Sequence, residues 1–267
     1  MGSRLVLVGC GKMGGALLGG WLERGMEAGD ISVVEPDAAI ARTLREDLGV
    51  AVFADPGDLD SEVETVVFAV KPQVMEDVVP AYRPFAQAVF LSIAAGTTTG
   101  VLRGYLGADA AIVRAMPNTP AAIGRGITAA MASGPVSEEQ RQRCNDLLEA
   151  VGEVAWIDDE DLFDAVTALS GGGPAYVFLL AECMAQGGVE AGLPEDLARR
   201  LANATVAGSG ELMGRSSESP ETLRRNVSSP GGTTVEALQV LMGSEGLQPL
   251  ISRAIAAAAR RSRRMAG

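Results

Sequence analysis

The sequence predicts a doubly wound α/β fold with a mostly parallel sheet, followed by an all-helical part. In the first part, short apolar runs rich in β-branched residues alternate with segments of helical period. After residue 158 the strand signals stop, and only glycine and proline turns interrupt the helical pattern. A chain of 267 residues that is 47% hydrophobic is long enough for two domains. We expect them at residues 1–158 and 159–267.

The first elements are a strand, a glycine turn and a helix. An apolar run over residues 5–8 meets Gly9-x-Gly11-x-x-Gly14, and helical character follows. Glycines at this spacing permit a tight turn, close approach of a pyrophosphate and tight packing of the helix on the strand. The context predicts a dinucleotide here, and the alternative is a glycine-rich turn without a ligand. We expect Cys10 to be a small, partly buried filler rather than a redox thiol.

Glu35 follows the second predicted strand, residues 31–34, and an amphipathic helix over residues 38–48 ends at Gly49. A carboxylate at this point accepts hydrogen bonds from the adenine ribose of NAD. If this carboxylate lay about 4 Å from the 2′-phosphate of NADPH, the repulsion would cost on the order of 4 kcal/mol per charge pair at an effective dielectric of about 20. The cost is avoided if the side chain swings away or if Arg42 compensates the charge. The position favours NADH, a solvated loop glutamate is the alternative, and the choice between NADH and NADPH stays open.

Later loops should gather at one edge of the sheet. The further strands are expected at residues 50–53, 65–70, 88–93, 111–115, 127–132 and 153–157, with helices at residues 73–82, 99–106 and 137–151. Open α/β sheets bind ligands at the carboxyl ends of their strands. We therefore expect the loops after three of these strands to flank the cofactor. The residues concerned are Ala69, Val70, Lys71, Pro72, Ala94, Ala95, Gly96 and Asn118.

The helical half contains a loop suited to a small anion. Residues 229–234 read Ser-Pro-Gly-Gly-Thr-Thr and precede a helical run over residues 235–242. Such a loop presents unpaired backbone N–H groups at a helix N-terminus, with hydroxyls beside them, and so predicts a carboxylate pocket. An ordinary capped helix start is the alternative. Ser170, beside three glycines, is either a cap or a place where the backbone touches a ligand.

Composition excludes several kinds of chemistry. Histidine is absent, so a Ser-His-Asp arrangement and most zinc sites are excluded, and we expect no metal. The 22 basic residues include only two lysines, Lys12 and Lys71, and 34 acidic residues leave a net charge of −12. That charge disfavours nucleic acid and anionic membranes. The arginine cluster at residues 260–264 suits the last turn of a helix, and the acidic residues 158–161 suit a helix start.

The expected location follows from two further features. No unbroken apolar run approaches the roughly 18 residues of a membrane helix. Three scattered cysteines, Cys10, Cys144 and Cys183, form no disulfide framework. Both features are typical of a cytoplasmic protein.

The motifs together resemble the pyrroline-5-carboxylate reductase family over the whole chain. They are Val8-Gly9-Cys10-Gly11-Lys12-Met13-Gly14, Ala69-Val70-Lys71-Pro72, Met116-Pro117-Asn118-Thr119-Pro120, Leu169-Ser170-Gly171-Gly172-Gly173-Pro174-Ala175-Tyr176 and Val227-Ser228-Ser229-Pro230-Gly231-Gly232-Thr233-Thr234. The last is the most specific to the family. The resemblance implies a Rossmann-type domain and an all-α domain that interlocks with a second subunit. It also implies a homodimer, often assembled into a ring of dimers, that reduces the cyclic imine 1-pyrroline-5-carboxylate to L-proline with NAD(P)H.

Site residues follow from the resemblance and from the sheet-edge argument. For the cofactor they are Gly9, Gly11, Lys12, Met13, Gly14, Glu35, Ala69, Val70, Lys71, Pro72, Ala94, Ala95, Gly96, Asn118 and Asn226. For the substrate they are Ser229, Gly231, Gly232, Thr233, Thr234, Glu160 and Thr167. The sequence departs from the family at Glu35, where relatives that use NADPH have a small polar residue. It departs again at Gly172, where many relatives have serine.

The implied reaction needs no histidine. A cyclic imine becomes strongly electrophilic once its nitrogen is protonated, so orientation against a hydride donor does most of the work. Thr234, or water held by it, is the candidate that donates or orders this proton. We expect it to be the catalytic residue.

Two other functions fit parts of the pattern. A dehydrogenase of the β-hydroxyacid type has a similar two-domain plan but uses a lysine in its helical half, and no lysine follows Lys71. A non-catalytic NAD(P)-binding sensor would bind a dinucleotide without turnover. The ring size of the imine and the number of subunits beyond a dimer stay open.

Overall fold

The computed structural model describes residues 4–59 and 62–265. Contacts divide the chain into two compact units. The first, here the α/β unit, comprises Met1–Gly171 and Ala259–Gly267, and the second, here the helical unit, comprises Gly172–Ala258. The domain boundary expected between residues 158 and 159 lies earlier in the chain than this division and stays a prediction.

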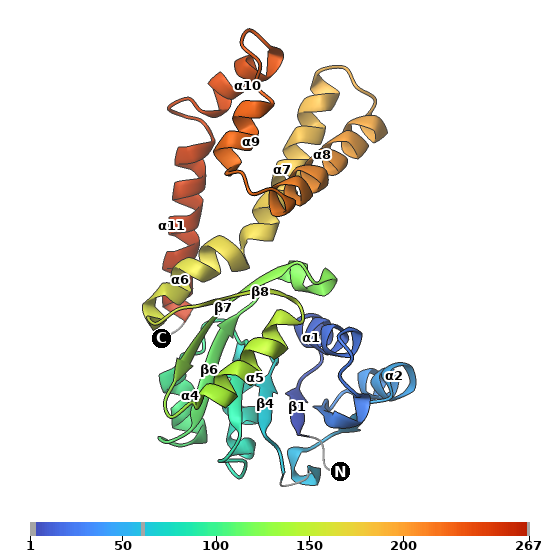
Figure 1. Cartoon of the computed structure of the whole chain (residues 1–267), viewed down its shortest axis with the longest axis vertical. Coiled ribbons are helices and arrows are strands. Elements are labelled where there is room, and N and C mark those ends of the chain that lie inside the picture. Colours follow the sequence, from blue (N-terminus) through green and yellow to red (C-terminus); the bar gives the residue numbers. More distant parts are fainter. Residues whose placement is uncertain (1–3, 60–61, 266–267) are drawn as a thin grey trace. The chain divides into compact units, whose positions relative to one another are not determined.

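An 8-stranded sheet forms the centre of the α/β unit, with strand order β3-β2-β1-β4-β5-β6-β7-β8 (Figure 1). All neighbouring strands are parallel except the antiparallel pair β6 and β7. The strands are β1 (Leu5–Val8), β2 (Ile31–Val34), β3 (Ala51–Phe53), β4 (Thr65–Phe68), β5 (Val89–Ser92), β6 (Ala111–Met116), β7 (Gly126–Ser133) and β8 (Gly152–Trp156). The predicted doubly wound, mostly parallel sheet is confirmed.

Helices cover both faces of this sheet because the strands are apolar on both sides. In β1, Leu5 and Leu7 pack in the core beneath α1, α2 and α5, whereas Val6 and Val8 pack in the core beneath α3, η4 and α4. These elements are α1 (Lys12–Glu23), α2 (Ala38–Leu48), α5 (Glu138–Glu149), α3 (Met75–Val78), η4 (Val79–Tyr82) and α4 (Thr99–Leu106). The two cores fix the sheet and hence the edge where its carboxyl ends meet.

One predicted helix is interrupted. Residues 73–82 form three short turns, η3 (Pro72–Val74), α3 and η4, instead of a continuous helix. Pro80 accounts for the break between α3 and η4, because proline has no N–H to donate and its ring clashes with the preceding turn. The predicted helix over residues 38–48 is confirmed, with Asp37 capping its start and Gly49 in the left-handed conformation at its end.

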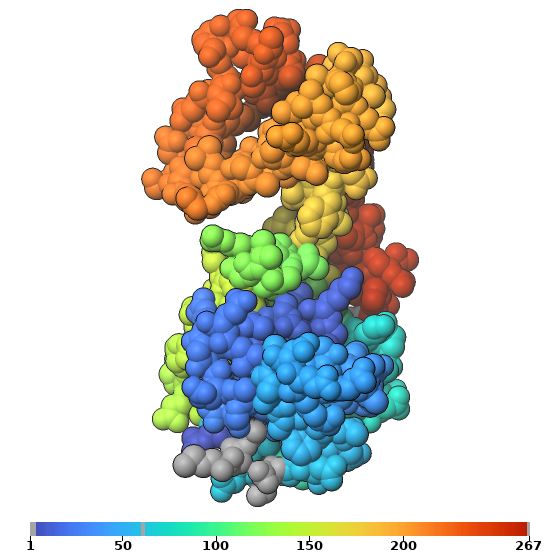
Figure 2. Space-filling model, turned by 90° about the vertical axis from the view of Figure 1, so that its right-hand side faces the viewer, coloured from blue at the N-terminus to red at the C-terminus, as the bar shows by residue number. Residues whose placement is uncertain are grey.

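In the α/β unit, η5 (Thr119–Ile123) lies between β6 and β7, and η6 (Glu160–Leu162), α6 (Phe163–Val166) and the π-helix η7 (Thr167–Gly171) follow β8. The helical unit comes next in the chain. Its helices are α7 (Gly173–Glu190), α8 (Glu195–Arg215), α9 (Pro220–Asn226), α10 (Thr233–Leu241) and most of α11 (Leu247–Met265). In the described chain no strand follows β8, so the all-helical prediction is confirmed. The helices α7 and α8 pack side by side (Figures 1 and 2, yellow to orange).

The helical unit buries very little apolar surface. Of its described residues, the buried apolar ones are Ala198 and Ala202, both small. Phe178 on α7 is 62% exposed and Leu179 is 57% exposed. One helical stretch, Glu160–Glu190, is apolar enough by length and composition to cross a membrane, although no unbroken apolar run predicted it. Only 11% of its most apolar window is buried within the chain.

Candidate cofactor and anion sites

The glycine turn between β1 and α1 has the shape that a pyrophosphate needs. Gly9 has a φ of +83°, and a Cβ there would lie 2.6 Å from Cγ1 of Val70. A Cβ at Gly14 would lie 2.4 Å from the Gly9 carbonyl oxygen, so these two glycines are required by the fold itself. Gly11 differs, because a Cβ there would meet nothing within 4 Å. Space for a ligand is the reason that remains for glycine at this position.

The start of α1 is open to an anion. No side chain caps this helix, whose N-cap is Gly11, and its first turn contains no acidic residue. A helix N-terminus carries unpaired N–H groups and a partial positive charge. Lys12 is exposed at the first helical position, and Met13 packs against the core below. The predicted dinucleotide turn therefore fits its ligand in shape and in charge.

Glu35 is built into this turn rather than solvated. Its side chain is buried, and Oε2 accepts a hydrogen bond of 3.0 Å from the backbone N–H of Cys10. The other oxygen, Oε1, accepts a hydrogen bond of 3.0 Å from the backbone N–H of Asp37. Burial, with the charge of Glu35, raises the pKa of the Cys10 thiol to about 11. Cys10 is thus a buried neutral thiol, as expected of a filler.

The predicted cofactor loops meet at one edge of the sheet. The strands β1, β4 and β5 are adjacent and parallel, so the glycine turn, residues 69–72 and residues 94–96 leave the same edge. Val70 lies against Gly9, and the backbone N–H of Ala94 donates to Oγ of Ser92 at 3.3 Å. The structure brings these predicted cofactor residues together.

The side chain of Asn118 is hydrogen-bonded to β7 and to the π-helix η7. Its Oδ1 accepts from the backbone N–H of Ile127 at 3.0 Å, and its Nδ2 donates to Oγ of Ser170 at 3.4 Å. Ser170 belongs to the π-helix η7, which begins at Thr167, and π-helical turns recur at functional sites. A Cβ at Gly171 would lie 2.6 Å from Cε of Met116. The end of β6 and the π-helix are therefore held in contact.

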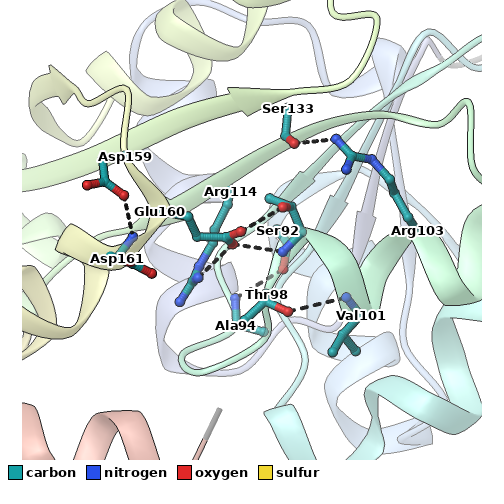
Figure 3. Close-up of polar contacts among 11 residues, drawn as sticks. Ser92, Ala94, Thr98, Val101, Arg103, Arg114, Ser133, Asp159, Glu160 and Asp161 are labelled. Carbon is teal, nitrogen blue, oxygen red and sulfur yellow. Dashed lines mark hydrogen bonds and ion pairs between the residues drawn. The ribbon is translucent and has the colours of Figure 1, made fainter. Parts of the chain in front are cut away.

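Glu160, a predicted substrate residue, accepts three hydrogen bonds from two residues of the α/β unit. Its Oε1 accepts from the backbone N–H of Thr99 at 2.8 Å and from NH1 of Arg114 at 2.7 Å. Its Oε2 accepts from the Thr99 hydroxyl at 2.8 Å. Figure 3 shows Arg114 and Glu160 pointing toward one another from β6 and η6. Burial alone raises the pKa of Glu160, but the hydrogen bonds from Thr99 and Arg114 outweigh burial and lower it below the ordinary 4.5.

Arg114 and Thr99 escaped the sequence-based list of site residues. Arg114 is a buried cation in an otherwise apolar strand, and its guanidinium lies 4.2 Å from the centre of the buried Phe163 ring. A single charged residue inside an apolar strand was a signal for it, because buried charges need partners. No local signal pointed to Thr99, whose partner is 61 residues away.

In the helical unit, residues 229–234 form a defined turn before a helix. The backbone N–H of Gly232 donates to the Ser229 carbonyl at 2.9 Å, and Gly231 has a φ of +74°, which with the preceding proline makes a type II turn. The helix α10 begins at Thr233, and no side chain caps it. The alternative of an ordinary capped helix start is wrong, so the first N–H groups of α10 are open to an anion.

Hydroxyls surround this open helix start. The side chains of Ser229, Thr233 and Thr234 are exposed. Asn226, predicted to contact the cofactor, donates from Nδ2 to Oε2 of Glu218 at 3.1 Å within the same unit. Residues 229–234, here the anion loop, and Asn226 thus belong to the helical unit. The other predicted site residues belong to the α/β unit.

Comparison with known families matches both halves of the chain. Residues 160–265 match the family described as pyrroline-5-carboxylate reductase dimerisation. Residues 4–96 match the family described as NADP oxidoreductase, coenzyme F420-dependent.

Individual relatives match over nearly the full length. A pyrroline-5-carboxylate reductase of Synechocystis sp. is 38% identical and covers 99% of each chain. One of Pseudomonas aeruginosa is 36% identical and covers 98% of this chain and 97% of its own. A solved pyrroline-5-carboxylate reductase from Coxiella burnetii has a TM-score of 0.94 at 31% identity and covers 100% of both chains. A Plasmodium falciparum pyrroline carboxylate reductase, solved with NADP bound, has a TM-score of 0.83 at 28% identity and covers 99% and 98%.

Proposed function

The chain belongs to the pyrroline-5-carboxylate reductase family, and on that premise we propose that it reduces 1-pyrroline-5-carboxylate to L-proline, the last step of proline biosynthesis. It is an NAD(P)H-dependent oxidoreductase that acts on a cyclic imine. One observation carries the proposal: two helices, α1 and α10, begin without a side-chain cap where an anion is expected. The first suits a pyrophosphate and the second suits the carboxylate of a small imino acid.

The cofactor is held by the edge of the sheet in the α/β unit. Gly11 leaves room for the pyrophosphate, and the loops at residues 69–72 and 94–96 border the nicotinamide end. When bound, the reduced nicotinamide supplies the hydride that the imine carbon accepts. Lys12, Asn118 and Asn226 complete the proposed cofactor contacts.

NADH is the preferred cofactor in this proposal, because Glu35 is held in place. To move away from a 2′-phosphate, its carboxylate would give up hydrogen bonds to Cys10 and Asp37 and leave a buried N–H without a partner. If the Glu35 carboxylate stayed in place, it would lie beside the 2′-phosphate of NADPH, which carries the same sign of charge. A ribose 2′-hydroxyl, in contrast, can donate to a lone pair that these two bonds leave free.

The substrate is held by the anion loop. The open N–H groups of α10 and the hydroxyls of Ser229 and Thr233 bind its carboxylate, and the backbone at Gly231 and Gly232 lets it approach. Thr234, or water that it holds, delivers or orders the proton at the ring nitrogen. The chain provides no histidine for this step, and an iminium that is already protonated needs none.

Assembly as a homodimer, and further as a ring of dimers, completes the proposal. The exposed apolar side chains of α7 lie in the segment that matches the dimerisation family, and a partner subunit covers them. This assignment also accounts for the apolar stretch Glu160–Glu190 without a membrane. The protein acts in the cytoplasm, and its net charge of −12 disfavours nucleic acid.

One assay tests this function. Oxidation of NADH and of NADPH is followed separately with pyrroline-5-carboxylate and then with its six-membered homologue. We expect turnover with the five-membered imine and faster turnover with NADH. Dinucleotide binding without turnover on either imine would instead identify a non-catalytic sensor.

A further inference from the structure

We propose that Glu160 is a positioning residue of the cofactor edge, the edge of the sheet formed by the glycine turn and by residues 69–72 and 94–96. Arg114 holds the Glu160 carboxylate in place. The carboxylate in turn holds the start of α4 and thereby the loop at residues 94–96. This inference rests on the proposed function, which places the nicotinamide against that loop. It assigns Glu160 a role that differs from the substrate contact implied by the family resemblance. The carboxylate acts through Thr99, without touching substrate.

The geometry of the carboxylate supports this role. Three hydrogen bonds of 2.7 to 2.8 Å reach its two oxygens, and all three come from the chain itself. Two of them come from Thr99, the first residue of α4, where backbone N–H groups have no partner within the helix. The carboxylate of Glu160 therefore fills at α4 the position that an anion takes at an open helix N-terminus.

Arg114 keeps the carboxylate in this position. Its guanidinium is buried, lies over the Phe163 ring at 4.2 Å and donates to Oε1 of Glu160 at 2.7 Å. A guanidinium that is stacked on one side and paired on the other has little freedom to move. The pair thus connects the carboxyl half of β6 to the start of α4.

The loop that precedes α4 is short and tied at both ends. At one end, the N–H of Ala94 donates to Oγ of Ser92. At the other, the side chain of Thr98 accepts from the N–H of Val101 at 3.2 Å (Figure 3). The next residue along the chain, Thr99, donates to Glu160. Loss of the carboxylate removes a further tie, the pair of hydrogen bonds from Thr99 that follows directly after this loop, and frees residues 94–96 to shift. A shift of the nicotinamide border weakens cofactor binding and misaligns the hydride.

A second argument comes from charge. An imino acid brings its own carboxylate, and a second carboxylate at contact distance repels it. Glu160 already has Arg114 as its counter-ion, so the substrate carboxylate finds no free cation there. The open N–H groups of α10 provide the free site.

The test compares Glu160→Gln and Glu160→Ala with wild type. We expect the dissociation constant of NADH, measured by nicotinamide fluorescence, to rise about tenfold in Glu160→Ala, because a buried cation and a helix start lose their partner. The KM for the imino acid should change by less than about twofold, which is less than the loss of one typical hydrogen bond would cause. Formate, which supplies the lost carboxylate, should restore part of the NADH affinity of Glu160→Ala.

Glu64→Gln is the matched control. Glu64 also pairs with arginines, at 3.1 Å from Arg4 and 3.2 Å from Arg143, but it precedes β4 at the opposite edge of the sheet. Loss of an ion pair as such would affect Glu64→Gln and Glu160→Gln alike, and that result would overturn the inference. So would unchanged NADH affinity in Glu160→Ala together with a raised KM for the imino acid, since that pattern identifies a substrate contact.

The outcomes separate this inference from the proposed function. NADH affinity is measured without substrate, so it reports on the cofactor edge even if wild type turns over no imine. Absence of turnover in wild type, with the expected loss of NADH affinity in Glu160→Ala, refutes the function and keeps the positioning role. If wild type turns over the imine and Glu160→Ala binds NADH as tightly as wild type, the proposed function stands and the positioning role is refuted.

Discussion

The two units differ in how far each completes itself. In the α/β unit the largest fully buried side chains, such as Trp21, Phe68 and Phe90, form cores on both faces of the sheet. In the helical unit the described buried apolar residues are two alanines, whereas Phe178 is 62% exposed. The difference teaches that the cofactor edge stands on a self-sufficient fold. The proposed substrate loop stands on helices whose large apolar side chains are left exposed within the described chain.

The helix starts show the same contrast. Within the α/β unit α2, α4 and α5 are capped by their own side chains, and α1 alone among its long helices is open, at the predicted cofactor turn. In the helical unit α10 is open at the predicted substrate loop. The helices α7 and α8 also begin without a side-chain cap, so an open start indicates an anion site only together with a glycine loop such as those before α1 and α10.

The largest expected effect comes from a charge placed on the exposed apolar face of α7. Phe178→Glu should convert the dimer to monomer and reduce kcat/KM more than about a hundredfold, because a charge in a desolvated interface is costly. Light scattering after size exclusion gives the mass. Ile40→Glu makes the same change at a residue of α2 that is 38% exposed, and it should leave mass and activity unchanged. A fully active dimer of Phe178→Glu would refute the contrast between the units.

The next effect concerns the open start of α10. Thr234→Ala should lower kcat about a hundredfold, which is typical of losing a group that places a proton. Thr234→Ser keeps the hydroxyl and should retain most of the rate. Thr233→Ala is the matched neighbour and should mainly raise the KM for the imino acid. If Thr234→Ala retains the full rate at every pH, Thr234 has no part in proton transfer.

A smaller effect is expected at Glu35. Glu35→Gln keeps an oxygen for one of the two backbone N–H groups and removes the charge. The ratio of kcat/KM with NADPH to that with NADH should rise about tenfold, since part of the like-charge repulsion disappears. Parallel steady-state assays with the two cofactors give this ratio. An unchanged ratio would show that Glu35 does not select the cofactor.

The smallest effect is a pH dependence of stability. Burial raises the pKa of Glu160, but hydrogen bonds from Thr99 and Arg114 hold it below the ordinary 4.5. A lowered carboxyl pKa contributes stability that is complete above the ordinary value and is lost as pH falls through the folded value. Glu160→Gln should therefore be less stable than wild type at neutral pH by about 1 kcal/mol, and the gap should narrow below pH 4.5. Denaturant unfolding at several pH values measures this gap, and a constant gap would contradict the assignment.

Local signals in the sequence predicted most of the fold. The helix over residues 38–48 was found from its amphipathic pattern and from Gly49 at its end, and both signals lie in or next to the element itself. The glycine turn was found for the same reason. The helix over residues 73–82 was misread because its apolar pattern outweighed the break at Pro80.

Nonlocal contacts limited the prediction of the site. Glu160 was chosen from the family resemblance, but its partners Arg114 and Thr99 are 46 and 61 residues away in the sequence and meet it only in the folded unit. The exposure of α7 could not be predicted either. Its apolar residues are not confined to one face, and such a pattern is the same for a core helix and for an interface helix. Glu35 shows a third limit, since its bond to Cys10 depends on the parallel pairing of β1 and β2.

The most direct test of the whole account is whether the enzyme binds the carboxylate of its substrate. NADH oxidation is measured with 1-pyrroline-5-carboxylate and with 1-pyrroline, which has the same imine ring but no carboxylate. The account predicts that kcat/KM falls at least about a hundredfold without the carboxylate, because the open N–H groups of α10 then have nothing to bind. Equal rates on the two rings would contradict it.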